Sequence, residues 1–145
     1  MDEVIDHRDR RFPPWYWLVA VAALLFELAG SYAYYLQMTT DPAGLPVDQR
    51  ALIQSTPVWI NAAYGLAVLA GVIGAVGLLQ RRRFATGALG LSLAMVLVQF
   101  GGIMLVPALR QSIPSDQLLG PIVIFLLAYG FWQFARAAAR RGWLH

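Results

Sequence analysis

One acidic residue stands in a segment that is otherwise apolar enough to lie in lipid. Glu27 occupies the middle of AALLFELAGSYAYY, residues 22–35, and Ser31 and Tyr34 follow it at spacings of four and seven. Side chains at these spacings share one face of an α-helix. Because a charge at the bilayer centre costs about 2.5–3.5 kcal/mol, we expect this face to turn toward the interior of a helix bundle.

Two interpretations of Glu27 stay open on the sequence alone. In the first, the carboxyl group is neutral, because an apolar medium disfavours the charged form, and it is hydrogen-bonded to Gln99, Ser31 or Asn61. In the second, the carboxylate exchanges protons or binds a cation. The candidate intramembrane polar site therefore consists of Glu27, Ser31, Tyr34, Asn61 and Gln99.

The sequence carries no recognisable catalytic constellation. It has no cysteine, and its two histidines, His7 and His145, lie near the ends of the chain. No nucleophile–base pair, cluster of metal-ligating residues or phosphate-binding loop is present. We expect no catalytic residues, no metal and no cofactor, and we expect that the protein is not an enzyme.

The distribution of charge defines the elements that must position the polar residues. Hydrophobic residues make up 59% of the 145 residues and charged residues only 13%, about half the roughly 25% typical of soluble proteins. A helix crosses a hydrocarbon core of roughly 30 Å in about 20 residues. Four segments meet this requirement, at about 15–37, 57–79, 84–108 and 118–137. The sequence predicts an all-α membrane protein whose residues 15–137 form a four-transmembrane-helix bundle.

The arginines predict how the bundle is oriented. Nine of the eleven fall in three clusters, at residues 8–11, at Arg81, Arg82 and Arg83, and at residues 136–141. Because short loops rich in basic residues stay in the cytoplasm, both termini are expected there. Residues 1–14 would be a cytoplasmic basic arm, residues 138–145 a cytoplasmic tail, and residues 38–56 an outer loop with a short interfacial helix at 47–54. Binding of anionic lipid head groups is the alternative role of the clusters, and no nucleic-acid partner is expected.

Small residues mark the faces on which the helices are expected to pack. The second segment contains Gly65, Gly71 and Gly74, and the third contains Gly87 and Gly90. Small residues let helix backbones approach closely in lipid, where no hydrophobic effect drives helices together. These glycines therefore predict packing within the bundle, with a dimerisation face as the alternative.

Three stretches give the chain a resemblance to a known family. They are WYWLVAVAALLFELAG in the first segment, PVW at residues 57–59, and GVIGAVGLLQRRRFA at the end of the second segment. In these the chain resembles the DoxX-like small four-span membrane proteins of bacteria, over nearly its whole length. Some of those proteins are labelled sugar transporters, and the name comes from a subunit of a thiosulfate:quinone oxidoreductase. FELAGS, residues 26–31, is also similar to the glutamate-bearing stretch of small multidrug resistance transporters.

These observations lead to three expected functions for a multi-pass protein of the bacterial inner membrane. The first is a component of small-solute transport, which would require a homo-oligomer because four helices leave little room for a solute path. The second is an accessory or assembly subunit of a larger, quinone-linked redox complex. The third, implied by the second resemblance, is a proton-coupled exporter. The expected partners are the lipid bilayer and either further copies of the chain or a larger membrane complex.

Overall fold

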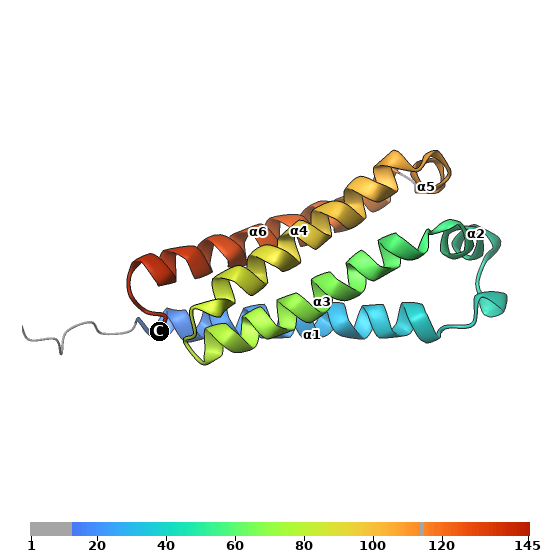
Figure 1. Cartoon of the computed structure of the whole chain (residues 1–145). Coiled ribbons are helices and arrows are strands. Elements are labelled where there is room, and N and C mark those ends of the chain that lie inside the picture. The colour runs from blue at the N-terminus through green and yellow to red at the C-terminus, as the bar shows by residue number, and fades with distance from the viewer. Residues whose placement is uncertain (1–12, 114) are drawn as a thin grey trace, which may run out of the picture.

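The described part of the chain consists of helices joined by short connections (Figure 1). The computed structural model describes residues 13–113 and 115–145, so most of the predicted basic arm lies outside the described residues. Four long helices are apolar enough to cross a membrane: α1 (Pro14–Thr39), α3 (Val58–Leu79), α4 (Phe84–Leu105) and α6 (Leu119–Arg140). Among the described residues there is no strand. The prediction of an all-α, four-helix membrane protein is confirmed.

Short helical elements connect the long helices at one end of the bundle. They are η2 (Pro42–Gly44), α2 (Val47–Ser55), α5 (Pro107–Ser112) and η3 (Ser115–Leu118). The helix expected at residues 47–54 is present as α2, which contacts α5. The third long helix ends at Leu105 and not near residue 108, because Pro107 disfavours helical geometry at the preceding residue. Val106 accordingly has extended backbone angles (φ −88°, ψ 109°).

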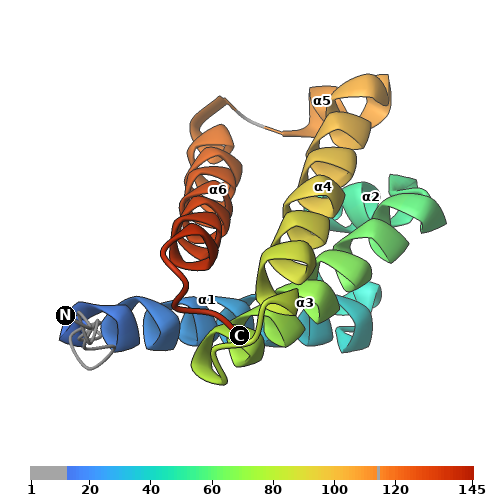
Figure 2. The same cartoon turned by 60° about the vertical axis from the view of Figure 1, so that its left-hand side comes forward.

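The long helices pack in the spatial order α1, α3, α4, α6. The α3–α4 hairpin forms the centre, α1 packs on α3, and α6 packs on α4. In Figures 1 and 2, the pair α4 and α6 leans away from the pair α1 and α3 with increasing distance from the α3–α4 turn. We call the end that contains this turn the turn end, and the end that contains α2 and α5 the loop end. The beginning of α1 and the end of α6 both lie at the turn end.

The turn end is filled by a continuous apolar core. Its members are buried side chains of all four long helices and of the segment that follows α6: Tyr16, Ala20, Ala23, Ala75, Leu78, Ala85, Leu89, Ala135, Ala138 and Leu144. The hydroxyl group of Tyr16 donates a hydrogen bond of 2.6 Å to the carbonyl oxygen of Leu78, which joins α1 to the end of α3. This half of the bundle is therefore closely packed.

The segment after α6 packs against the bundle, whereas a tail was expected. α6 continues three residues beyond the predicted end, and Gly142, with a φ of 72°, then turns the chain back. The amide of Arg83 donates to the carbonyl of His145 (2.9 Å), and the amide of His145 donates to the carbonyl of Arg81 (2.7 Å). Leu144 is only 1% exposed. The burial of this leucine explains why the segment is held on the α3–α4 turn.

Four of the five glycines predicted for packing lie against side chains of neighbouring helices. A Cβ atom added at Gly65 would meet Tyr34, and one added at Gly71 would meet Glu27. At Gly74 it would meet Leu89, and at Gly90 it would meet Trp132. Gly87 differs, since a Cβ there would have no neighbouring atom within 4 Å. The close approaches at the first four positions occur within one chain, which accounts for these glycines without a dimer.

Candidate functional site

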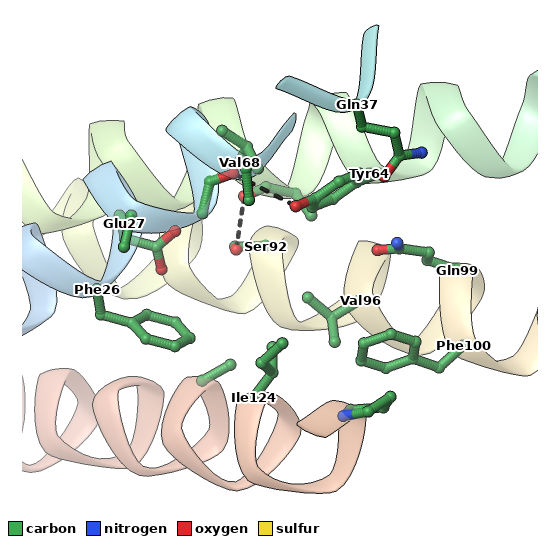
Figure 3. A pocket seen from close by; sticks show the side chains of 16 residues that line it. Phe26, Glu27, Gln37, Tyr64, Val68, Ser92, Val96, Gln99, Phe100 and Ile124 are labelled. Carbon is green, nitrogen blue, oxygen red and sulfur yellow. Dashed lines mark hydrogen bonds between the residues drawn. The ribbon is translucent and has the colours of Figure 1, made fainter. Parts of the chain in front are cut away.

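A cavity of about 420 Å³ lies between the four long helices in the half of the bundle toward the loop end. Figure 3 shows side chains from α1, α3, α4 and α6 around it. It is partly open and mostly apolar, and its polar side chains are Glu27, Gln37, Tyr64, Ser92 and Gln99. Its size falls in the range of about 300–1,000 Å³ that small-molecule sites occupy. The splaying of the helix pairs from the α3–α4 turn leaves this space unfilled.

Glu27 lies halfway along α1, at the end of the cavity nearer the turn end, which we call the deep end. It is thirteen residues beyond the first residue of α1, which places it about 20 Å along the helix. Its side chain is only 6% exposed, and its carboxyl group occupies the space that a side chain on Gly71 would fill. The carboxyl group of Glu27 thus rests on the bare backbone of α3, and only a glycine at position 71 leaves room for it.

No hydrogen bond to the Glu27 carboxyl group is formed by the residues that the structure describes. The hydroxyl group of Ser31 was expected as a partner, but it donates to the backbone carbonyl oxygen of Glu27 at 2.8 Å. A serine within a helix commonly bonds the carbonyl four residues earlier, because that oxygen is the nearest acceptor. The Glu27 carboxyl group is consequently a buried polar group that faces the cavity without a protein donor.

Two hydroxyl groups of the cavity wall donate their protons to backbone carbonyl oxygens of other helices. Ser92 on α4 donates to Ala67 on α3 at 2.7 Å, and Tyr64 on α3 donates to Gly30 on α1 at 3.3 Å (Figure 3). A hydroxyl group has one proton and two lone pairs. Both oxygens therefore retain lone pairs but have no further proton to give.

Ser92 is bonded to the same part of α3 on which the Glu27 carboxyl group rests. The carbonyl oxygen of Ala67, to which Ser92 donates, is one helical turn from Gly71, where the Glu27 carboxyl group rests. Figure 3 shows the Glu27 carboxyl and the Ser92 hydroxyl pointing toward the same region between the helices, next to the ring of Phe26. These two oxygen-bearing groups form the deep end of the cavity.

Amide side chains line the part of the cavity toward the loop end. Gln99 lies seven residues beyond Ser92 on α4, two turns or about 10 Å farther from Glu27. Gln37, near the end of α1, donates a hydrogen bond of 3.2 Å to the side-chain oxygen of Asn61. The cavity thus changes from acidic at its deep end to amide-lined near the loop end.

The structure brings together only part of the predicted polar site. Glu27 and Gln99 both line the cavity, but at different depths. Asn61 bonds Gln37, and Tyr34 packs edge-on against Tyr64 with ring centroids 5.0 Å apart. Asn61 lies ten residues before Gly71 on α3, about 15 Å along the helix, which is too far for a hydrogen bond to Glu27.

Sequence reasoning did not place Ser92, Tyr64 and Gly71 around Glu27. One signal was available, because Ser92 and Gln99 are seven residues apart and therefore share a helix face. Tyr64 and Gly71 have the same spacing on α3. The spacing identifies the face, but the partner of that face depends on how the helices pack.

Among the described residues that line the cavity, Glu27 is the only acid. No arginine, lysine or histidine is among the residues that line the cavity. Within the described ranges, there is also no group of three or more His, Cys, Asp or Glu residues that could hold a metal ion. The arrangement is suited to holding a hydrogen-bond donor or a positive charge in a mostly apolar space.

Comparison with known proteins gives no relative from which a function could be transferred. No family model matches the chain, and neither curated sequences nor solved structures show a significant match. The resemblance to DoxX-like proteins stays a prediction, and the function must be argued from the cavity itself.

Proposed function

We propose that the protein is a component of small-solute transport whose solute binds in the cavity between the four long helices. The observation that carries this proposal is the position of the cavity, which lies between the four long helices and includes a buried acid halfway along α1. Polar and ionisable residues inside a membrane are costly, and they commonly mark paths of substrates or ions. A polar residue that only held helices together would instead be expected to form hydrogen bonds with another helix.

The packing of the two halves supports transport over simple binding. The turn end is solid, whereas the cavity occupies the half toward the loop end. A transporter must present its site to each side of the membrane in turn. A bundle that is packed in one half and open in the other has the form expected of one of these two states. The α4–α6 pair moving against the α1–α3 pair would exchange the open and closed halves.

The arginines support an orientation for this state. Arg81, Arg82 and Arg83 lie at the turn end, as does the last turn of α6 with Arg140. On the basis of the charge rule, we propose that this end faces the cytoplasm of a bacterial cell and that the cavity faces outward. Transport by so few helices would use more than one copy of the chain.

Cysteine accessibility tests the proposal without knowledge of the solute, because the chain has no cysteine of its own. Val96 lines the cavity, so Val96→Cys in liposomes should react with a membrane-impermeant methanethiosulfonate added from either side. Leu25→Cys, whose side chain is 62% exposed on α1 and faces away from the core, should not react from either side. Labelling of Val96→Cys from one side only, or from neither, would overturn transport.

An accessory subunit is the second candidate function, and it differs in its expected partners. In this case the protein should remain attached to a larger membrane complex when it is extracted gently in detergent. Native mass spectrometry distinguishes the two candidates, since a transporter should appear as the chain itself in one or more copies. A complex with a redox enzyme, together with one-sided labelling, would favour the accessory role.

A further inference from the structure

We propose that residues 142–145, which follow α6, hold the turn end closed and must detach before the cavity can open toward that end. We call this segment the latch. The inference rests on the proposed transport function and names the part of the chain that regulates access to the solute cavity.

Hydrogen bonds hold the latch on the α3–α4 turn. Besides the two backbone bonds of His145 with the turn, the Nε atom of Arg81 donates to the carbonyl oxygen of Trp143 at 3.1 Å. The Nε atom of Arg83 donates to the carbonyl oxygen of Leu144 at 3.4 Å. Figure 2 shows the end of the chain lying beside this turn. The latch is thus bound to the connection that joins the α1–α3 pair to the α4–α6 pair.

The latch also connects α6 directly to α1. The amide of Trp143 donates to the carbonyl oxygen of Ala138 on α6 at 2.9 Å. Its ring packs edge-on against Trp15 and Tyr16 on α1, with centroids 5.7 and 5.9 Å apart. Leu144 is buried in the core of the turn end, together with side chains of all four long helices. The two helix pairs therefore cannot separate at the turn end without breaking these contacts.

Aromatic contacts between α1 and α6 are the alternative means of closure. The ring of Phe134 packs on Trp15 and Tyr16, with centroids 5.7 and 5.4 Å apart. Ring contacts are favourable over a range of about 4.5–7 Å and in several orientations, so they tolerate a change in helix tilt. Hydrogen bonds weaken steeply when their length or angle changes. The bonds of the latch therefore restrict the closed geometry more strongly than the rings do.

The position of the latch allows it to detach. Residues 143–145 have irregular backbone, so their movement does not require a long helix to unwind. Arg83 and His145 are exposed, and in the proposed orientation they lie at the cytoplasmic surface. Backbone groups released there can bond water, whereas groups released within lipid would stay unsatisfied. Burial of Leu144 is then the main contribution that detachment must overcome.

The test measures how fast two positions react with a small methanethiosulfonate. Ala20 is fully buried in the core of the turn end, and Gln99 lines the cavity toward the loop end. Ala20→Cys and Gln99→Cys are made separately in the full chain, which has no cysteine of its own, and are labelled in nanodiscs, where the reagent reaches both ends. An exchange of the open and closed halves should speed the first reaction and slow the second.

Two variants weaken the latch in different ways. Gly142 has a φ of 72°, a left-handed conformation that costs alanine free energy, so Gly142→Ala disfavours the turn that brings the latch back. Leu144→Ala removes the buried side chain. Each should raise the rate at Ala20→Cys by about five-fold or more and lower the rate at Gln99→Cys. Gly130→Ala on α6 has no atom within 4 Å of the new Cβ and should change neither rate.

Only opposite changes at the two cysteines, in both latch variants, support the latch. Rates that rise together would indicate a general loosening of the bundle, which loss of a merely structural contact would produce. Unchanged rates would show that the segment does not hold the turn end closed. Either result would overturn the latch, as would a change at one cysteine alone or in one variant alone.

The transport test of Val96→Cys, in the otherwise unmodified chain, is independent of these rates. Two-sided labelling of Val96→Cys without opposite changes in the latch variants would keep transport and overturn the latch. One-sided labelling of Val96→Cys with opposite changes would overturn transport and leave the latch as a device that closes a binding cavity.

Discussion

The contact between Glu27 and Gly71 gives the sharpest prediction, because it depends on a single close approach of two helices. A Cβ atom added at Gly71 would overlap both oxygens of the Glu27 carboxyl group. In Gly71→Ala, the carboxyl group must either turn farther into the cavity or push α1 away from α3. Either response costs free energy and changes the deep end of the cavity.

The magnitude follows from two opposing effects. Replacing glycine by alanine inside a helix favours folding by about 1 kcal/mol. Overpacking of a close contact costs about 1–3 kcal/mol. Gly130→Ala on α6 serves as the control, because a Cβ there has no neighbour within 4 Å and only the helix effect remains. We therefore expect Gly71→Ala to be less stable than Gly130→Ala by about 1–3 kcal/mol.

A double-mutant cycle assigns the cost to the carboxyl group. In a Glu27→Ala background, the space beside position 71 is empty, so most of the cost of Gly71→Ala should disappear. In a Glu27→Gln background, the amide occupies the same space and the cost should remain. The coupling energy between the two sites should lie within the range of about 0.5–3 kcal/mol seen for residues in contact.

The assay is reversible unfolding of each variant in mixed micelles, followed by the near-ultraviolet circular dichroism of the five tryptophans. The free energies of unfolding are compared at the same detergent composition. If Gly71→Ala is as stable as Gly130→Ala, the carboxyl group of Glu27 does not rest on α3. If the cost is the same with and without the Glu27 side chain, the clash lies elsewhere and the description of the deep end is wrong.

Three further predictions concern other parts of the bundle. Leu144→Ala should lower the free energy of unfolding by about 2–5 kcal/mol, since Leu144 is 1% exposed, whereas Leu25→Ala on a 62% exposed side chain should have a much smaller effect in the same assay. Ser92→Ala should cost about 0.6–1.7 kcal/mol through loss of its hydrogen bond to α3, and a neutral result would show that this bond contributes nothing. Gly44→Cys, at the end of η2, should react with an impermeant thiol reagent added to intact cells, and Arg82→Cys should not. The reverse pattern would contradict the proposed orientation.

The number and length of the long helices could be predicted from the sequence. Apolar segments of about 20 residues have few structural options in lipid, because every backbone polar group must be bonded within the segment. The ends of the helices were harder to predict from hydropathy where individual residues determined them. Pro107 ended α4 earlier than hydropathy suggested, and the burial of Leu144 could not be inferred from a short terminal segment that carries two arginines.

The candidate site was predictable in two residues, Glu27 and Gln99, which both line the cavity, and not in its other surroundings. The cost of burying an acid in lipid indicated that Glu27 faces the bundle interior, and it does line the cavity. Ser31 and Tyr34 share its helix face by spacing, yet the first bonds its own helix and the second packs on Gly65 and Tyr64. Spacing along one helix places side chains on a face but does not determine what lies opposite.

The sequence by itself determined that this chain forms four membrane-spanning helices and that an acid lies near mid-membrane depth. Both results follow from properties of single segments, namely length, hydropathy and the position of one charge. Only the tertiary structure decided that Glu27 meets Gly71, that Ser92 lies beside it, and that a cavity remains toward the loop end. These features depend on the rotation and tilt of each helix against its neighbours. Many weak contacts between small side chains fix that geometry, and no single segment encodes it.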